Sequence, residues 1–310
     1  MKIYEFLNHV ERFPNPVLTI GNYDGIHIGH KKIIEKVKEK ALMINGTPML
    51  MTFYPHPVSV VKPDKILCLI TPLNVRKRLI EESGIDVLFV LPFTEEFRLL
   101  TPQEFVENIL VDKLGIKGLI VGYDFKFGRG GKGDTQLLKQ LSGTYGFFFE
   151  VVEAVTLDGE KIGSNRIRKL IMEGDVKKAE LFLGRPHMIE GKVVHGDGRG
   201  KGIGFPTINL KTDYELIPKD GVYISEVEIN GKMFPSVTNI GYNPTFDVKK
   251  LSVETHILDY SGDLYGADLT LYFHERIRGE IKFDGADALM NQIAMDIKIT
   301  KEYFHKTIKQ

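Results

Sequence analysis

The chain has 310 residues, 43% of them hydrophobic and 26% charged, and its formal net charge at pH 7 is zero. Such a composition excludes a disordered chain, and the length allows two domains of ordinary size. Zero net charge provides no broad attraction to nucleic acid, so we expect no nucleic-acid partner and only local anion-binding sites.

The first half of the chain is predicted to alternate between strands and helices. Apolar residues at helical spacing predict helices at 30–44 and 105–114, the second preceded by Thr101-Pro102 with Glu104 in its first turn. Short apolar runs predict buried strands at 17–20, 49–53, 86–91 and 117–121. Such alternation implies an α/β domain with a parallel sheet, in which ligands bind beyond the carboxyl ends of the strands.

The pattern changes around Gly184-Arg185-Pro186, where short strand candidates replace the alternation. These strands are predicted at 189–194, 221–229, 232–239, 252–258 and 268–274. Asn230-Gly231 between two of them indicates a hairpin, because both positions tolerate positive φ. Closely spaced antiparallel strands predict a small β-barrel. Apolar residues that recur every fourth position predict a helix at 287–304, which we expect to cap the barrel.

The sequence also indicates a compartment. Its single cysteine, Cys68, cannot form an intramolecular disulfide, which fits a reducing environment. The first five residues continue into polar positions and form no signal-peptide core. No apolar run approaches the length that spans a membrane. We therefore expect a cytoplasmic protein with no membrane association.

The most informative motif is His27-Ile28-Gly29-His30, which follows a predicted strand and the glycine-punctuated turn 21–25. A helix that starts here offers unpaired N–H groups and partial positive charge to a polyphosphate. Two imidazoles three residues apart project to one side and can stabilise charge on the oxygens of an attacked phosphorus. This pattern is typical of ATP-dependent nucleotidyl transfer. The alternative is a pair of helix-capping or metal-binding histidines.

Three other segments are candidates to complete this site. One ends a strand with an aromatic pair and holds His56 between two prolines; its range is 52–57. A second, 122–131, combines aromatic faces with glycines and suits a planar ring plus phosphate. In the third, Ser164 is a plausible cap of a helix from which Arg168 could bind a triphosphate bidentately. Loops at a sheet edge and a plain surface helix are the alternatives.

A second dense segment spans 195–209. Five glycines alternate there with Arg199 and Lys201, so the backbone can wrap a polyphosphate while the cations neutralise it. Thr207 and Asn209 then offer a hydroxyl and a carbonyl oxygen, the hard donors that suit Mg²⁺ beside phosphates. The segment is not a Walker loop, because no Gly-Lys-Ser/Thr follows at the required spacing. A flexible hairpin is the alternative.

Alternation in 252–259 places Val253, Thr255 and Ile257 on one face of a strand and Glu254 on the other. From this pattern alone Glu254 is expected to face solvent, unless it lies at the mouth of the barrel and acts as a base. A basic strip follows, which could contact substrate or only keep the protein soluble; it comprises Arg276, Arg278 and Lys282.

Together these motifs resemble the prokaryotic bifunctional riboflavin kinase/FMN adenylyltransferase family, also called FAD synthetase. The resemblance covers essentially the whole chain, and it lies in the segments 21–30, 54–57, 122–128, 183–186, 204–209, 254–259 and 282–284. It implies a Rossmann-like nucleotidyltransferase domain at 1–184. It also implies a riboflavin kinase domain at 185–310, a small antiparallel Greek-key-type barrel with a C-terminal helix.

For the first domain the resemblance implies adenylylation of FMN by ATP, which gives FAD and pyrophosphate. His27 and His30 match the residues that stabilise the transition state. The other expected contacts divide by ligand: Gly21, Asn22, Asp24, Gly29, Ser164, Asn165 and Arg168 for the nucleotide, and His56, Asp124 and Phe125 for the flavin.

For the second domain the resemblance implies transfer of the γ-phosphate of ATP to the 5′-hydroxyl of riboflavin. Glu254 matches the general base, which overrides its interpretation as a solvent-facing residue, and Thr207 and Asn209 match the Mg²⁺-nucleotide ligands. The remaining expected contacts are Gly198, Lys201, Gly204, Phe205 and Pro206 for the nucleotide and Arg278 for the flavin. Riboflavin, FMN and ATP are the expected small-molecule substrates, and flavin-requiring apoproteins are expected acceptors of the product.

Two departures from the family pattern are present. Gly163-Ser164-Asn165 stands where the family carries Ser-Ser-Thr, and Ile208 replaces an alanine between Thr207 and Asn209. The first departure keeps a single-activity enzyme open as an alternative. More distant alternatives are a class I aminoacyl-tRNA-synthetase-like protein, which shares the His27–His30 string, and a non-catalytic flavin-sensing module. A dead copy would be expected to lose His27, His30, Thr207 or Glu254, and all four are present.

Overall fold

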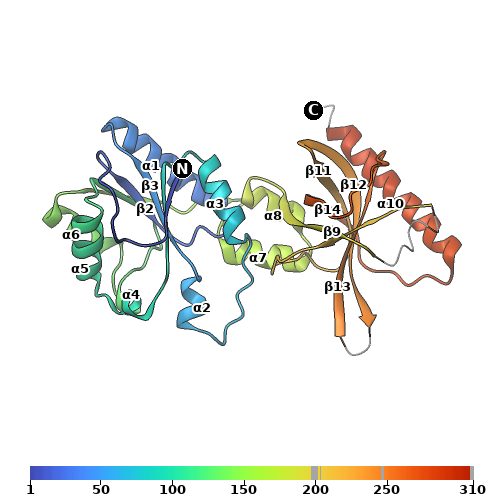
Figure 1. Ribbon diagram of the computed structural model, residues 1–310, viewed down its shortest axis with the longest axis horizontal. Helices are drawn as coiled ribbons and strands as arrows, with labels where there is room; N and C mark the ends of the chain where they lie inside the picture. Colours follow the sequence, from blue (N-terminus) through green and yellow to red (C-terminus); the bar gives the residue numbers. More distant parts are fainter. Residues whose placement is uncertain (197–201, 203, 246–247, 308–310) are drawn as a thin grey trace. The chain divides into compact units, whose positions relative to one another are not determined.

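The computed structural model describes residues 1–196, 202, 204–245 and 248–307 (Figure 1). Its internal contacts divide the chain into two compact units, Met1–Ser164 and Asn165–Gln310. The expected combination of an α/β domain followed by a β-barrel is confirmed. The boundary at 184/185 concerns the catalytic domains and stays a prediction.

A six-stranded parallel sheet forms the centre of the first unit, in the order β1-β4-β3-β2-β5-β6. Its strands are β1 (Lys2–Tyr4), β2 (Val17–Ile20), β3 (Pro48–Phe53), β4 (Val87–Leu91), β5 (Gly118–Gly122) and β6 (Phe148–Val152). From β2 the chain proceeds through β3 to β4, and then returns to β5 on the other side of β2. The strand order therefore reverses at β2 and β5, and the loops after these strands flank the place where such sheets bind ligands.

Helices cover both faces of this sheet. The longer ones are α1 (Ile28–Met43), α3 (Leu73–Glu82), η1 (Phe105–Lys113) and α6 (Thr135–Tyr145). The shorter elements are α2 (Pro57–Val61), α4 (Glu95–Leu99), α5 (Pro102–Glu104), η2 (Arg129–Gly131) and the hairpin β7 (Thr156–Leu157) and β8 (Glu160–Lys161). The predicted helix 105–114 is confirmed, and the helical segment starts earlier, at Pro102, because Thr101 and Glu104 form a reciprocal capping box at its N-terminus.

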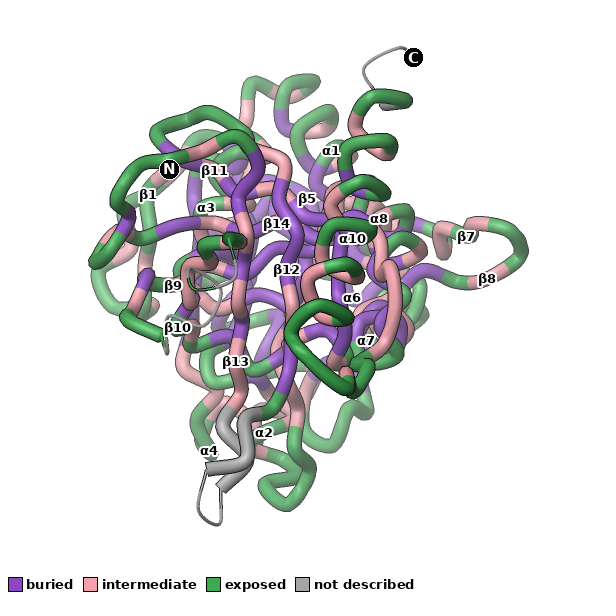
Figure 2. Tube along the Cα trace, turned by 90° about the vertical axis from the view of Figure 1, so that its right-hand side faces the viewer, coloured by how far each residue is buried: buried purple, intermediate pink, exposed green. Residues whose placement is uncertain are grey.

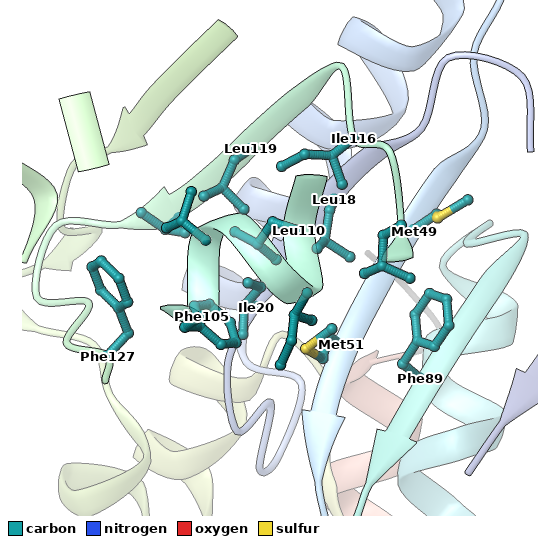
Figure 3. Packing of buried hydrophobic residues seen from close by; sticks show 14 of the residues in the cluster. Leu18, Ile20, Met49, Met51, Phe89, Phe105, Leu110, Ile116, Leu119 and Phe127 are labelled. Atoms are coloured by element: carbon teal, nitrogen blue, oxygen red, sulfur yellow. The ribbon is translucent and has the colours of Figure 1, made fainter. Parts of the chain in front are cut away.

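Two hydrophobic clusters explain why the strands are nearly continuous apolar runs. One cluster joins Leu18 and Met49 to η1 residues such as Phe105 and Leu110 (Figure 3). Alternate strand residues such as Val17 belong to the other cluster, with α1. Because the central strands β2, β3, β4 and β5 are buried on both faces, their sequences show no polar alternation.

The second unit contains a closed barrel of six antiparallel strands in the order β10-β13-β12-β11-β14-β9. The helices α7 (Ser164–Glu173) and α8 (Val176–Leu183) precede it, and α10 (Ala286–Thr307) follows it. The strands are β9 (His187–Val194), β10 (Ile208–Lys211), β11 (Gly221–Ile229), β12 (Lys232–Thr245), β13 (Val248–Ile257) and β14 (Asp268–Arg278). Since β14 returns beside β11, the order β14-β11-β12-β13 is a Greek key, as predicted.

A row of hydroxyl groups crosses the barrel interior. Ser225 Oγ lies 2.7 Å from the hydroxyls of both Ser236 and Thr238, and Thr238 Oγ1 lies 2.9 Å from that of Thr255. All four residues are fully buried, and Figure 2 shows buried and intermediate positions interspersed along the barrel strands. Buried hydroxyls that satisfy one another cost little free energy of folding, so this row fixes the register of β11, β12 and β13.

Candidate functional sites

The turn after β2 holds an unusual backbone conformation. Tyr23, Gly25 and Ile26 have φ values of 50°, 88° and 41°. For the two residues that are not glycine, this region is disfavoured, and for β-branched Ile26 strongly so. The surrounding structure must therefore hold the turn in place.

Two side chains hold the turn at Asn22. Its carbonyl oxygen accepts hydrogen bonds from Thr52 Oγ1 at the end of β3 (3.1 Å) and from Arg76 Nη1 on α3 (3.0 Å). Both donors are fully buried. The hydroxyl of Tyr23 lies 2.6 Å from that of Thr19, and burial raises the pKa of this phenol. The backbone around Asn22 is thus bound from two neighbouring elements.

The predicted nucleotide ligand Asp24 has its carboxylate occupied by the protein. Its two oxygens accept hydrogen bonds from the backbone N–H groups of Ile70 and Thr71, each at 3.1 Å, and Thr71 Oγ1 receives the N–H of Gly25. Asp24 is 1% exposed. These bonds tie the turn to the segment before α3, so the Asp24 carboxylate holds the turn in position.

His27 is the N-cap of α1, and its Nδ1 accepts the backbone N–H of His30 at 3.2 Å. A backbone N–H only donates, so Nδ1 is unprotonated and the neutral ring carries its proton on Nε2. The rings of His27 and His30 stack with centroids 3.5 Å apart and an interplanar angle of 17°. The predicted pairing of the two imidazoles at a helix start is therefore present in the fold.

His30 occupies an enclosed position. Its ring lies 4.8 Å from that of Tyr23, and within the described part of the chain its buried Nδ1 has no hydrogen-bond partner. Burial, then the neighbouring His27 and Arg76, lowers the pKa of His30 well below 6.5. The imidazole is consequently neutral near pH 7.

Gly29 allows this packing. A Cβ at this position would lie 3.2 Å from both Cε1 and Nδ1 of His27. The His27 ring is already confined by its stacking on His30 and by its capping bond. Gly29, in the first turn of α1, therefore leaves the space that the His27 ring occupies. At Gly21 a Cβ would similarly approach the Tyr23 ring, at 3.1 Å.

The residues predicted on the flavin side lie after β3 and β5, at the same carboxyl edge of the sheet. His56 is the N-cap of α2, and its Nδ1 accepts the N–H of Val58 at 3.1 Å. Asp124 is exposed, whereas Phe125 is half-buried and stacks on Phe127 with centroids 5.8 Å apart. Asp124 is therefore accessible to a ligand, while Phe125 already packs on the core.

Ser164 is the last residue of the first unit. Its hydroxyl donates a hydrogen bond to the carbonyl oxygen of Asp24 at 2.9 Å. Asn165 and Arg168 belong to the second unit. There, Arg168 Nη1 donates to Asn165 Oδ1 at 2.7 Å, and the arginine is 9% exposed. The amide that replaces the family's hydroxyl residue thus binds the arginine one turn away.

In the barrel, Glu254 lies opposite Asn209 on β10 and opposite Asn239 on β12. Side chains at such positions project to one face. That face is the one opposite to buried Val253 and Thr255, as the sequence predicts. Glu254 is half-buried, and its Oε1 accepts the hydroxyl of Ser252 at 2.9 Å, which orients the carboxylate.

The segment before β10 is attached to β13. His256 Nδ1 donates to the carbonyl oxygen of Pro206 at 2.8 Å, and the Phe205 and His256 rings meet edge to face. Gly204 is exposed with φ 86°, and Thr207 is half-buried. The predicted contacts Gly198 and Lys201 lie outside the described residues.

Gly196 leaves room for the Asn209 side chain. A Cβ on Gly196 would lie 2.1 Å from Asn209 Nδ2. The amide of Asn209 therefore lies directly against the backbone at 196, and any larger residue there would displace it.

The predicted flavin contact Arg278 already has protein partners. Its Nε and Nη2 donate to the Asp296 carboxylate on α10, and its Nη1 donates to the carbonyl oxygen of Gly279. Its role toward flavin stays a prediction.

Arg76 is not among the site residues predicted from the sequence, although its position in the apolar pattern of its helix could have indicated it. Arg76 follows Leu73 by three residues and precedes Ile80 by four, which places it on the apolar face of its helix. A charge in that position is unusual and marks a buried polar contact.

Two family models match the chain. The model for FAD synthetase matches residues 10–166, and that for riboflavin kinase matches residues 183–304. A relative from Bacillus subtilis, "Bifunctional riboflavin kinase/FMN adenylyltransferase", is 39% identical over 295 residues, which cover 93% of this chain and 92% of the relative. The chain belongs to this family. It is an enzyme with riboflavin kinase and FMN adenylyltransferase activities, and ATP and flavins are its substrates.

Other matches cover nearly the whole chain. The family member from Escherichia coli strain K12 is 36% identical over 310 residues, 99% of either chain. A crystal structure described as a macrolide-efflux protein from Streptococcus pneumoniae has a TM-score of 0.89 and 32% identity, and covers 96% of this chain and 98% of its own. Because both halves match their own family model, the two-activity family is favoured over a single-activity enzyme, a synthetase-like protein or a sensing module.

Among the described residues, no helix is both long and apolar enough to cross a membrane.

Proposed function

We propose that FMN is adenylylated at the carboxyl edge of the first unit's sheet, at the His27–His30 pair. The observation that carries this proposal is the stacked pair at the start of α1, where His27 offers an Nε2–H donor beside the N-terminal N–H groups of the helix. The FMN phosphate attacks the α-phosphorus of ATP, and pyrophosphate leaves. Because a phosphate monoester is already ionised near pH 7, the site needs donors and not a strong base.

The other residues of this site take supporting roles. Gly21, Asn22 and Gly29 shape the turn for the nucleotide phosphates, and Asp24 fixes it through the segment 70–71. His56, Asp124 and Phe125 are proposed to lie on the flavin side. Ser164, Asn165 and Arg168 are proposed to bind the nucleotide, and the bond from Arg168 to Asn165 supports this role because it pre-orients the guanidinium.

For the barrel, we propose that Glu254 removes the proton from the 5′-hydroxyl of riboflavin as that oxygen attacks the γ-phosphorus of a second ATP, which gives FMN and ADP. Its hydrogen bond from Ser252 keeps one oxygen occupied and leaves the other for the substrate hydroxyl. Thr207 and Asn209 are proposed to contact the nucleotide, together with Gly198, Lys201 and the segment 204–206. The shared face of Asn209 and Glu254 supports this arrangement.

Mg²⁺ fits the donors on this face. The Thr207 hydroxyl and the Asn209 carbonyl are neutral hard oxygens, and both residues are half-buried. The described residues contain no group of three or more His, Cys, Asp or Glu side chains that could hold a metal. We therefore propose that the ion arrives with the nucleotide and takes most of its ligands from phosphates and water, as Mg²⁺ commonly does. When bound, it would neutralise charge on the transferred phosphoryl group.

The two-site assignment is tested by incubating the protein with ATP, Mg²⁺ and either riboflavin or FMN, followed by chromatography for FMN and FAD. Glu254→Gln is expected to abolish FMN formation from riboflavin and to preserve FAD formation from supplied FMN. His27→Ala or His30→Ala is expected to do the reverse, lowering FAD formation by about 10²-fold or more. His305→Ala and Glu302→Gln, both on α10, serve as matched controls. Equal damage to both reactions by either active-site change, with the fold intact, would refute the assignment.

We also propose a cytoplasmic location and flavin-requiring apoproteins as acceptors of FAD. The single cysteine, Cys68, supports the location, because no intramolecular disulfide can form. Cell fractionation tests the location. Transfer of newly made FAD to an added apoflavoprotein, faster than from an equal amount of free FAD, tests direct delivery.

A further inference from the structure

Arg76 is a charged side chain inside the first unit. It lies on α3, has no exposed surface and is among the largest fully buried side chains of the described chain. Burying a guanidinium is strongly unfavourable unless its surroundings compensate for the lost hydration. A residue kept at that cost has a specific task, and its contacts indicate which.

Arg76 forms a hydrogen bond with the turn that leads to the histidine pair. Its Nη1 donates to the carbonyl oxygen of Asn22 at 3.0 Å, and Thr52 Oγ1 donates to the same oxygen at 3.1 Å. Asn22 directly precedes Tyr23, whose φ of 50° begins the strained part of the turn. Since only four residues separate Asn22 from His27, a shift of this carbonyl is transmitted to the N-cap of α1.

Arg76 also acts on the pair through its charge. Its guanidinium lies close enough to His30 to disfavour protonation of that ring, in the same direction as burial and His27. In the described part of the chain, the His30 ring contacts the rings of His27 and Tyr23, and Arg76 adds a permanent positive charge nearby. A fixed positive charge near two neutral imidazoles favours the binding of a polyphosphate to them.

The geometry points to Arg76 as a positioning residue for adenylyl transfer. It holds the Asn22 carbonyl and supplies a permanent positive charge near His30, and we assign it no contact with the substrate. This inference depends on the proposed assignment of adenylyl transfer to the His27–His30 site.

The test replaces Arg76 by methionine, which has similar length and no charge. Replacing a buried charge by an apolar residue of similar volume is often tolerated, so the variant is expected to fold. FMN adenylylation is expected to fall by about 10²-fold, as for small displacements of catalytic groups. Riboflavin phosphorylation in the same chain is expected to stay at the wild-type rate. Arg78→Met is the matched control, because Arg78 lies on the same helix with a side chain that is 46% exposed.

A second readout distinguishes positioning from general destabilisation. The titration midpoint of the His30 ring, followed by NMR of labelled histidine, is expected to rise in Arg76→Met and to stay unchanged in Arg76→Lys, which keeps the charge. Thr52→Val removes the other donor to Asn22 and is expected to lower adenylylation without moving that midpoint.

Wild-type adenylylation in a folded Arg76→Met variant, or an unmoved His30 midpoint, would overturn the inference. If Arg76→Met does not fold, wild-type adenylylation in both Arg76→Lys and Thr52→Val would overturn it. The proposed function fails separately: if His30→Ala adenylylates FMN normally, the site itself is wrongly assigned. If His30→Ala is inactive and Arg76→Met is fully active, only the role of Arg76 is wrong.

Discussion

Arg278 on β14 binds the carboxylate of Asp296 on α10 through both Nε, at 3.1 Å, and Nη2, at 2.7 Å. Asp296 is 1% exposed and also accepts a hydrogen bond from Gln292. The pair therefore joins the last strand of the barrel to the helix that follows it. Its burial and two-point geometry make it a structural clamp.

Removal of Asp296 leaves the Arg278 guanidinium without its buried counter-charge. We expect Asp296→Ala to lower the free energy of unfolding of the second unit by about 3–5 kcal/mol. Glu302→Gln, at an exposed position of the same helix, is expected to change it by less than about 0.5 kcal/mol. Urea denaturation of both variants measures the difference. If Arg278 acts only in flavin binding, the expected result differs: Arg278→Met would raise the KM for riboflavin and leave the free energy of unfolding unchanged.

Substitution of Gly196 tests the role of the Asn209 side chain in the proposed kinase site. Because a Cβ there would lie 2.1 Å from Asn209 Nδ2, Gly196→Ala must displace the Asn209 amide. We expect riboflavin phosphorylation to fall by about tenfold or more, while FAD formation from FMN is preserved. Gly285→Ala is the control, since a Cβ there would meet nothing within 4 Å. Normal phosphorylation by Gly196→Ala would show that the placement of Asn209 does not matter.

Gly29 and Gly143 form a matched pair of helical glycines in the first unit. Alanine in a helix is more stable than glycine by about 1 kcal/mol, and at Gly143 a Cβ would meet nothing within 4 Å. Gly143→Ala is therefore expected to stabilise the unit with unchanged activity. In Gly29→Ala the new methyl group presses on the His27 ring, so FMN adenylylation is expected to fall. Melting curves and adenylylation rates of the two variants check this, and equal activity would contradict it.

The sequence predicts those parts of the fold in which local pattern and tertiary environment agree. β2 and β11 have the predicted bounds, because one is a continuous apolar run and the other ends at the hairpin signal Asn230-Gly231. Sequence reasoning does not find β10, a four-residue strand directly after a glycine-rich segment. That strand forms because β9 and β13 need a partner to close the barrel, which is a property of the whole unit.

The candidate sites follow the same division. The helix-start pairing of His27 with His30 and the face of Glu254 follow from periodicities of a few residues. The partners of the Asp24 carboxylate do not, because they are backbone groups 46 and 47 residues further along the chain. Backbone donors leave no signature in a sequence. Nor does sequence predict that Arg278 is occupied by Asp296, since that contact depends on where α10 packs.

His187 predicts how the second unit responds to acid. The side chain is 2% exposed, and burial, together with the nearby Arg185, lowers the pKa of its ring to about 3. In the unfolded chain the pKa is 6.5. Below that pH the unfolded state binds a proton that the folded state does not bind, so the free energy of unfolding falls as the pH falls. The decrease begins near pH 6.5 and continues until the ring protonates in the folded state.

Between pH 8 and pH 5 this single group is expected to lower the free energy of unfolding by about 2 kcal/mol. His187→Leu removes the titrating ring, so its stability should fall less over the same interval. Urea denaturation of both proteins at the two pH values gives the difference, in which the contributions of other groups, including His30 in the first unit, cancel. His305→Leu, on the last turn of α10, is the control and should show the full decrease. An equal pH dependence of wild type and His187→Leu would mean that His187 is charged or solvated in the folded protein.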